Sequence, residues 1–178
     1  MWDDHGTGRR DGSDDDRYFA ELVGYLRRRG EVGPQPPFVI GVGGGACFAE
    51  RLAREGVHPL SGVALVGGTA RVASRRLTPV PRRALPVLLA VPGAGSAGRA
   101  GRVGLRTRLA LRDTGDHGLL ASDTLVADWE AVNGPAGAPV ERAPLGPTGR
   151  NGWPRAAAGA ALAAAVTQFA AALVAATA

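Results

Sequence analysis

The sequence predicts an α/β fold in which a mostly parallel sheet is flanked by helices. Three short apolar runs, at 38–41, 63–66 and 85–91, have the continuous hydrophobic character of strands that are buried on both faces. The composition, with 45% hydrophobic residues, 5% aromatic residues, 27 glycines and 13 prolines, is typical of a globular chain with many turns. The length of 178 residues suits one domain, which we assign to 16–178 after a flexible lead at 1–15.

The first half of the chain predicts a helix, a strand, a tight turn and a second helix. A helix is expected over 16–29, because apolar residues recur there at the spacing of one helical face: Phe19, Leu22, Val23 and Leu26. Glycines and prolines at 30–37 end this helix before the strand at 38–41. The glycines of 41–45 then form a tight turn into a helix at 46–55.

The second half predicts one further strand and one further helix before a long loop. The segment 105–111 alternates apolar residues with arginines, which favours a strand at the edge of the sheet. Ser122 can cap a helix that runs to about Val132 and ends at Asn133-Gly134. We expect 134–154, which is rich in proline and glycine, to be a loop.

The last segment, 155–178, consists almost entirely of alanine and is long enough to cross a bilayer. Alanine is nearly neutral for membrane insertion, however, and the bulky side chains of this segment lie on one stripe. The pattern favours a final helix packed on the sheet, and we do not expect a membrane partner. Because the first residues are acidic, unlike those of a signal peptide, we expect a cytoplasmic location.

Charge and cysteine content argue against several classes of function. All 21 basic residues are arginine and the net charge is +5, yet no aromatic interleaving or nucleic-acid motif accompanies the basic residues. Nucleic acid is therefore not an expected partner. Cys47 is the only cysteine, so the chain can form neither an internal disulfide nor a paired-cysteine zinc site. The histidines, His5, His58 and His117, lack metal-ligand spacing, and we expect neither metal nor cofactor.

An ordered set of short motifs resembles the carboxyl-terminal part of polyhydroxybutyrate-depolymerase-like and feruloyl-esterase-like α/β-hydrolases. The motifs are DDRYF at 15–19, FVIGVGGGA at 38–46, LPVLLAVPGAGS at 85–96, a segment with Trp129 and Asn133-Gly134, and GRNGWP at 149–154. They span most of 14–175. The resemblance implies a partial α/β-hydrolase fold whose first strands are missing. It also implies an exposed sheet edge that another copy or a partner covers, unless the chain is a shortened product.

The same resemblance places other residues where the family keeps its catalytic triad. Gly43 occupies the serine position, Ser96 the acid position and Asn151 the histidine position. A glycine offers no hydroxyl and an asparagine amide is not basic, so the resemblance implies an esterase-like protein without triad-dependent hydrolysis. Any remaining interaction with an ester would use the backbone amides of Gly43, Gly44 and Gly45.

Three other interpretations remain open. Cys47, or His117 with Asp116, could belong to an active carboxylic-ester hydrolase with a differently placed nucleophile. Gly41, Gly43 and Ala46 match a G-x-G-x-x-A dinucleotide fingerprint, with Arg71 available for the 2′-phosphate of NADP. The third interpretation is a non-catalytic interaction module.

Overall fold

The computed structural model describes residues 14–68, 70, 75–76, 78–91, 120–144 and 156–177. Within these ranges, a four-stranded, all-parallel sheet has the sequential order β1-β2-β3-β4. The strands are β1 Phe38–Val42, β2 Gly62–Val66, β3 Val87–Val91 and β4 Val140–Pro144. The helices are α1 Asp14–Arg28, α2 Gly44–Glu55, α6 Ser122–Ala136 and α7 Ala156–Thr177. The predicted α/β class, a parallel sheet flanked by helices, is confirmed.

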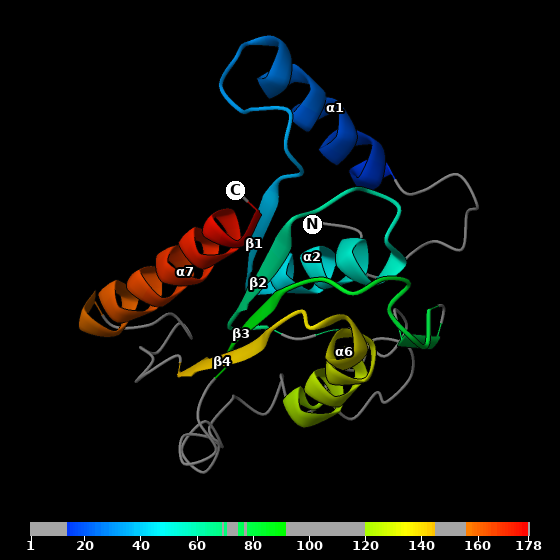
Figure 1. Cartoon of the computed structure of the whole chain (residues 1–178), viewed down its shortest axis with the longest axis vertical. Helices are drawn as coiled ribbons and strands as arrows, with labels where there is room; N and C mark the ends of the chain where they lie inside the picture. The colour runs from blue at the N-terminus through cyan, green and yellow to red at the C-terminus, as the bar shows by residue number, and fades with distance from the viewer. Residues whose placement is uncertain are drawn as a thin grey trace, which may run out of the picture.

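The sheet separates two hydrophobic cores, with α2 and α6 on one face and α7 on the other (Figure 1). Alternate residues of each strand point to opposite faces, so one strand supplies both cores. In β2, Val63 and Leu65 pack toward α2 and α6, whereas Ala64 and Val66 pack toward α7. This double burial explains why the central strands are apolar at every position.

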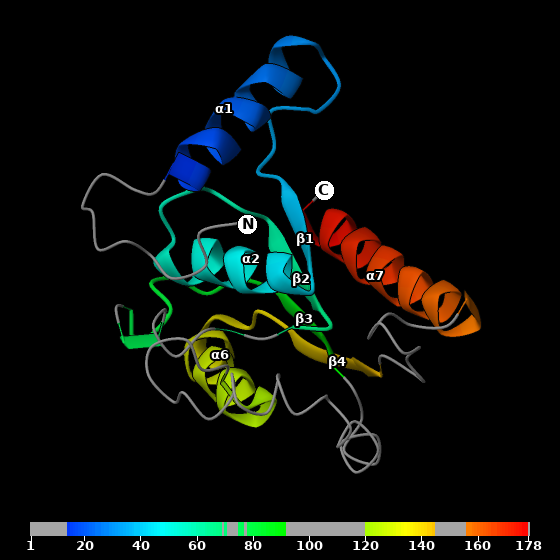
Figure 2. The ribbon, with the colours of Figure 1, turned by 180° about the vertical axis from the view of Figure 1, so that it is seen from behind.

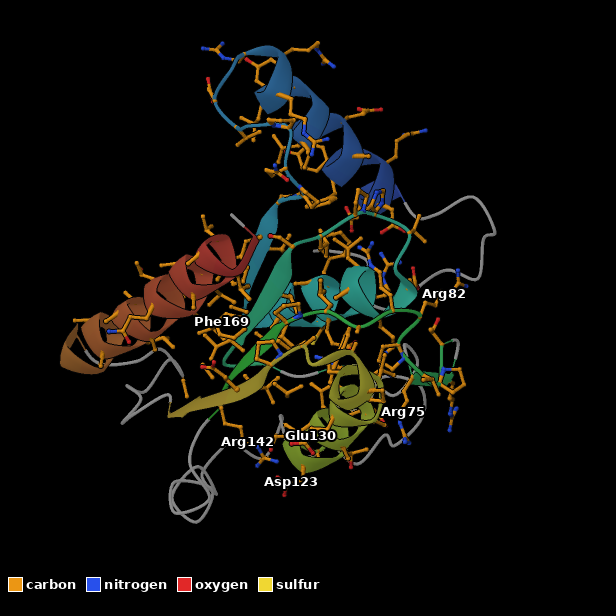
Figure 3. All side chains as sticks on the ribbon, in the orientation of Figure 1. Arg75, Arg82, Asp123, Glu130, Arg142 and Phe169 are labelled. Carbon is orange, nitrogen blue, oxygen red and sulfur yellow. The ribbon has the colours of Figure 1, made fainter. Side chains whose placement is uncertain are left out.

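The core on the α7 face is closed by three side chains of that helix, Leu162, Val166 and Phe169. They follow the helical spacing of one stripe, as the sequence predicts. Phe169 points from α7 toward the strands (Figure 3) and meets the ring of Phe38 at 6.0 Å between centroids. None of the helices in the described ranges is long and apolar enough to span a bilayer.

Helix α1 lies beyond the end of the sheet at which β1 begins, and its contacts with the body are few (Figure 2). Its main polar contact is a buried ion pair, in which Arg51 of α2 donates through Nη2 to Asp16 Oδ1 at 2.7 Å. Phe19 adds an edge-to-face contact with His58, at 5.5 Å between ring centroids. Much of the remaining surface of α1, including Tyr18 and Tyr25, is exposed.

Two predictions about the carboxyl-terminal half were wrong. Helix α6 does not end at Asn133-Gly134 but continues to Ala136, because the buried Asn133 side chain serves a tertiary contact instead of a cap. Its Nδ2 donates to the Leu85 carbonyl at 2.6 Å, and the Leu85 N–H donates to its Oδ1 at 3.0 Å. The expected loop at 134–154 contains the strand β4, which pairs with β3. The strand expected at 105–111 lies outside the described residues.

Candidate functional site

The candidate site is the turn between β1 and α2, whose apex is Gly43. Gly43 has φ 58° and ψ −120°, the dihedral angles of the first central residue of a type II′ turn. Positive φ of this kind strains a residue that has a side chain, whereas glycine adopts it without strain. Two hydrogen bonds hold it: Gly43 N–H donates to the Val66 carbonyl at 2.8 Å, and Ala46 N–H donates to the Gly43 carbonyl at 3.1 Å.

Close packing of the strand against the helix makes the turn sharp. A Cβ atom added at Gly41 would lie 2.6 Å from Ala46 Cα and 2.7 Å from Ala49 Cβ, and it would also collide with the Gly45 carbonyl. These distances are far below van der Waals contact, and two of the three groups are backbone that cannot rotate away. Only glycine at position 41 therefore lets α2 begin so close to β1.

The apex of the turn, by contrast, is open. A Cβ atom added at Gly43, Gly44 or Gly45 would meet nothing within 4 Å among the described residues. Ala46 N–H is already bonded to the Gly43 carbonyl, so the donors that this helix start can offer are the N–H groups of Gly44 and Gly45, where the helix dipole adds partial positive charge. The apex lies at the carboxyl end of β1, the edge at which open parallel sheets bind ligands.

Neither Cys47 nor His58 lies at this apex. Position 43 has no side chain, and Cys47 in the first half of α2 is only 2% exposed, packed in the interior. His58 follows the far end of α2, a 12-residue helix that spans about 18 Å. The turn can therefore offer backbone donors to a ligand, but no nucleophile or base from these residues.

The other predicted site residues lie in segments that follow the carboxyl ends of β2, β3 and β4. Arg71, Ser96, Asp116, His117 and Asn151 all fall outside the described residues. Sequence reasoning about them therefore stays a prediction. Among the described residues, no group of three or more histidine, cysteine, aspartate or glutamate side chains could hold a metal ion.

A small hollow of about 150 Å³ lies at the opposite end of α2, between α1 and the turn that contains His58. Phe19, Val23 and Pro59 are among the residues that line it. The His58 side chain is half-buried and its Nε2 is covered. The glycines of the turn do not line this hollow.

The middle and far end of α2 carry a buried charge network that sequence reasoning missed. Arg54 is completely buried and donates from Nε to Glu50 Oε1 at 2.6 Å and from Nη2 to Asp128 Oδ2 at 3.2 Å. Asp128, on α6, also accepts two hydrogen bonds from Arg75, at 2.8 and 3.0 Å. The network therefore joins α2 to α6 (Figure 3, Arg75 labelled).

Burial dominates the electrostatics of this network. Desolvation raises the pKa of Glu50 above its ordinary value, although the Arg54 guanidinium opposes the shift. Burial also raises the pKa of Glu55, against the opposing charge of Arg51. The four-residue spacing of the Glu50–Arg54 and Arg51–Glu55 pairs was a usable signal in the sequence, but it is equally typical of an exposed helix face.

The fold and the turn define an α/β domain with a glycine-apex strand–turn–helix unit. No protein-family description, curated protein or solved structure matches this chain.

Proposed function

We propose that the chain is a degenerate α/β-hydrolase-type domain, related to polyhydroxybutyrate depolymerases and feruloyl esterases, which binds an ester-type small molecule without triad-dependent hydrolysis. One observation carries the proposal. Gly43 sits at a sharp strand-to-helix turn with φ 58°, and serine hydrolases hold their nucleophile at such a turn. On this proposal, position 43 is the nucleophile position, and its lack of a side chain removes the hydroxyl that hydrolysis requires.

Two further features support this assignment. Close packing at Gly41 corresponds to the first glycine of a G-x-S-x-G turn, in which the helix must start directly against the strand. The sequential, all-parallel order β1-β2-β3-β4, with α2 and α6 on one face and α7 on the other, suits the carboxyl-terminal half of such a domain.

The chemistry explains why we propose binding rather than turnover. Loss of a serine nucleophile lowers turnover by about a million-fold, and what remains comes from backbone donors and substrate binding. Here those donors are the N–H groups at the start of α2, which suit a carbonyl oxygen that carries partial negative charge. The ligand class that this arrangement favours is a carboxylic ester.

Hydrolysis of a p-nitrophenyl ester tests the proposal through a restored side chain. The unmodified chain should hydrolyse the ester only at the slow rate that backbone donors and binding supply, and a Gly43→Ser, Asn151→His variant should exceed that rate by about 10- to 100-fold. The gain is limited because Ser96 stands at the acid position, and loss of the acid alone costs about 10⁴-fold. Position 43 has room for the hydroxyl, since a Cβ there meets nothing within 4 Å, although its φ of 58° makes serine strained at this position.

The matched control is a Gly44→Ser, Asn151→His variant, because position 44 is equally open but is not the apex. Equal rates for the two variants would contradict the assignment of position 43. A turnover of about 1 to 10³ s⁻¹ by the unmodified chain, the ordinary range for enzymes, would contradict the loss of activity and favour a nucleophile elsewhere.

Dinucleotide binding through Gly41, Gly43 and Ala46 is the competing proposal. The close approach at Gly41 suits it, but two features disfavour it. Dinucleotides bind where the strand order of a sheet reverses, and the described strands follow one another without reversal. In addition, β2 is followed by Gly67-Gly68, with no acidic residue there for the ribose. Titration with NADPH should leave its fluorescence unchanged; saturable enhancement would favour this function instead.

A further inference from the structure

The two outer strands of the sheet differ in how they are protected. Parallel sheets expose unpaired backbone groups at their edges, and monomeric proteins guard them with charges, proline or bulges. The outer strand β4 has such protection in Glu141, Arg142 and Pro144, and Arg142 forms an exposed ion pair with Asp123 at 2.8 Å (Figure 3). The other outer strand, β1, contains neither charge nor proline.

Strand β1 is hydrogen-bonded on one side only among the described residues (Figures 1 and 2). The Gly43 N–H donates to Val66 and the Pro37 carbonyl accepts from Ser61, both residues of the β2 segment. Because backbone direction alternates along a strand, odd-numbered residues of β1 face β2. Phe38, Ile40 and Val42 therefore direct their N–H and C=O groups to the open edge.

The side chains of these residues add an apolar surface to that edge. They lie on the α7 face of the sheet, where Phe38 packs against the α7 core and meets the ring of Phe169. Ile40 is 53% exposed and Val42 is 38% exposed. The open edge thus presents hydrogen-bonding groups and uncovered aliphatic side chains together, which is the combination that strand addition uses.

Charge and register single out a second copy of the same chain as the occupant. The chain has a net charge of +5, but 32–49 contains no charged residue, so two copies can approach along β1 without local repulsion. In an antiparallel pair centred on Ile40, Phe38 lies opposite Val42 of the other copy. On the α2 face, Val39 lies opposite Gly41. A large side chain therefore meets a smaller one on both faces.

The same register satisfies every outward backbone group of the strand. Ile40 meets its own counterpart as a hydrogen-bonded antiparallel pair, and Phe38 meets Val42 in the same manner. A twofold axis perpendicular to the sheet generates both halves of this contact from one surface, as expected for an isologous dimer. A register centred on Val39 would also pair Phe38 with Ile40, but it would set Val42 opposite Pro36, which has no N–H to donate.

We propose that two copies of the chain associate through β1, antiparallel and centred on Ile40, to form one continuous sheet. An interface built on two short strands is small and belongs with the weak and transient interfaces, so we expect a dissociation constant on the order of 10 µM or weaker. This proposal does not depend on the hydrolase assignment, because it uses no residue of the Gly43 apex.

Sedimentation velocity at about 5 to 500 µM tests the association. The unmodified chain should shift from monomer to dimer over this range. Ile40→Pro removes an outward N–H without touching the bonds to β2, and it should weaken association by at least about tenfold. Ile40→Lys places two charges at the twofold axis and should do the same. Val80→Lys, at an aliphatic residue that is 61% exposed outside β1, should leave association unchanged.

Cross-linking gives a second readout that does not depend on a stable variant interface. Ile40→Cys would bring two thiols together at the twofold axis, where hydrogen-bonded antiparallel Cα atoms lie about 5.5 Å apart, within disulfide range. Mild oxidation should therefore yield covalent dimer, whereas Val80→Cys should yield little. A monomer at all concentrations, or a dimer that both Ile40 substitutions leave intact, would overturn the proposal. Binding of an unrelated extended peptide without self-association would overturn it as well.

Discussion

The fold has no room for a side chain at Gly41. A Cβ atom at this position would lie 2.6 Å from Ala46 Cα, and the backbone there cannot move without shifting the start of α2. We expect Gly41→Ala to lower the free energy of unfolding by about 1 to 3 kcal/mol, the range of overpacked cores. Urea denaturation of the unmodified chain and the variant measures the difference.

Gly44→Ala is the matched control for this substitution. Position 44 has open space around a Cβ atom and lies at the first residue of α2, so alanine there should change stability by no more than about 0.5 kcal/mol. A similar loss in both variants would mean that strand and helix are not in the close contact described, and the glycine-apex turn would lose its structural basis.

Helix α2 contains an ion pair, between Arg54 and Glu50, whose two side chains are buried. Arg54 and Glu50 are both completely buried, and removing one partner leaves the other charge uncompensated. We expect Arg54→Met to lower the free energy of unfolding by about 3 to 5 kcal/mol. An Arg54→Met, Glu50→Gln double variant should recover part of this loss, because it removes both charges.

Arg75→Met serves as the control for this helix pair, because Arg75 also binds Asp128 but its side chain is 45% exposed. An exposed ion pair contributes about 0 to 1 kcal/mol, so this variant should be nearly as stable as the unmodified chain. If Arg54→Met were equally mild, the network would not join α2 to α6 as described.

The pH dependence of stability follows from the raised pKa of Glu50. Its ordinary value is 4.5, and burial raises it in the folded chain, so above pH 4.5 the unfolded state ionises first. Ionisation of the unfolded state favours unfolding, and stability falls as the pH rises from 4.5 toward the folded pKa. Relative to Glu50→Gln, the unmodified chain should therefore lose stability over this window.

Urea denaturation of both proteins at intervals from about pH 4 to pH 7 measures this difference. Glu55, whose pKa is also raised, is present in both proteins and cancels in the comparison. If the free energy of unfolding changed with pH in the same way for both proteins, the pKa of Glu50 would be equal in the folded and unfolded states, against this prediction.

Salt should act on the whole molecule through its net charge of +5. Two like-charged copies repel each other at long range, whereas the proposed contact along β1 contains no charged residue. Raising the salt from about 0.05 to 0.5 M shortens the screening length from over 10 Å to below 5 Å. We therefore expect sedimentation to show stronger association at high salt; weaker association would indicate an interface held by ion pairs.

A strand could be predicted from the sequence when its residue pattern matched its burial in the fold. The strands β1, β2 and β3 were predictable because burial on both faces demands apolar residues throughout. Strand β4 was not, since Val140–Pro144 includes two charges and a proline. Those residues suit an outer strand. The segment becomes a strand because it pairs with β3.

The candidate site shows the same division. The cluster of glycines at 41–45 predicted a tight turn, and the positive φ of Gly43 agrees with it. The burial of Glu50, Arg51 and Arg54 could not be predicted, because their spacing also suits a solvated helix face. Their partners Asp16 and Asp128 are distant in sequence, so only the packing of α1 and α6 against α2 brings the charges together.

The strand-forming runs, the amphipathic stripes and the glycine at the apex could be read from the sequence, because each is a property of neighbouring residues. Which strands are outermost among the described residues, where α6 ends and which charges are buried emerge only when distant segments pack together. These outcomes depend on contacts between segments far apart in the chain, whose energies no local pattern encodes. The open edge of β1 is one of them, since a strand becomes an edge only when its neighbours are known.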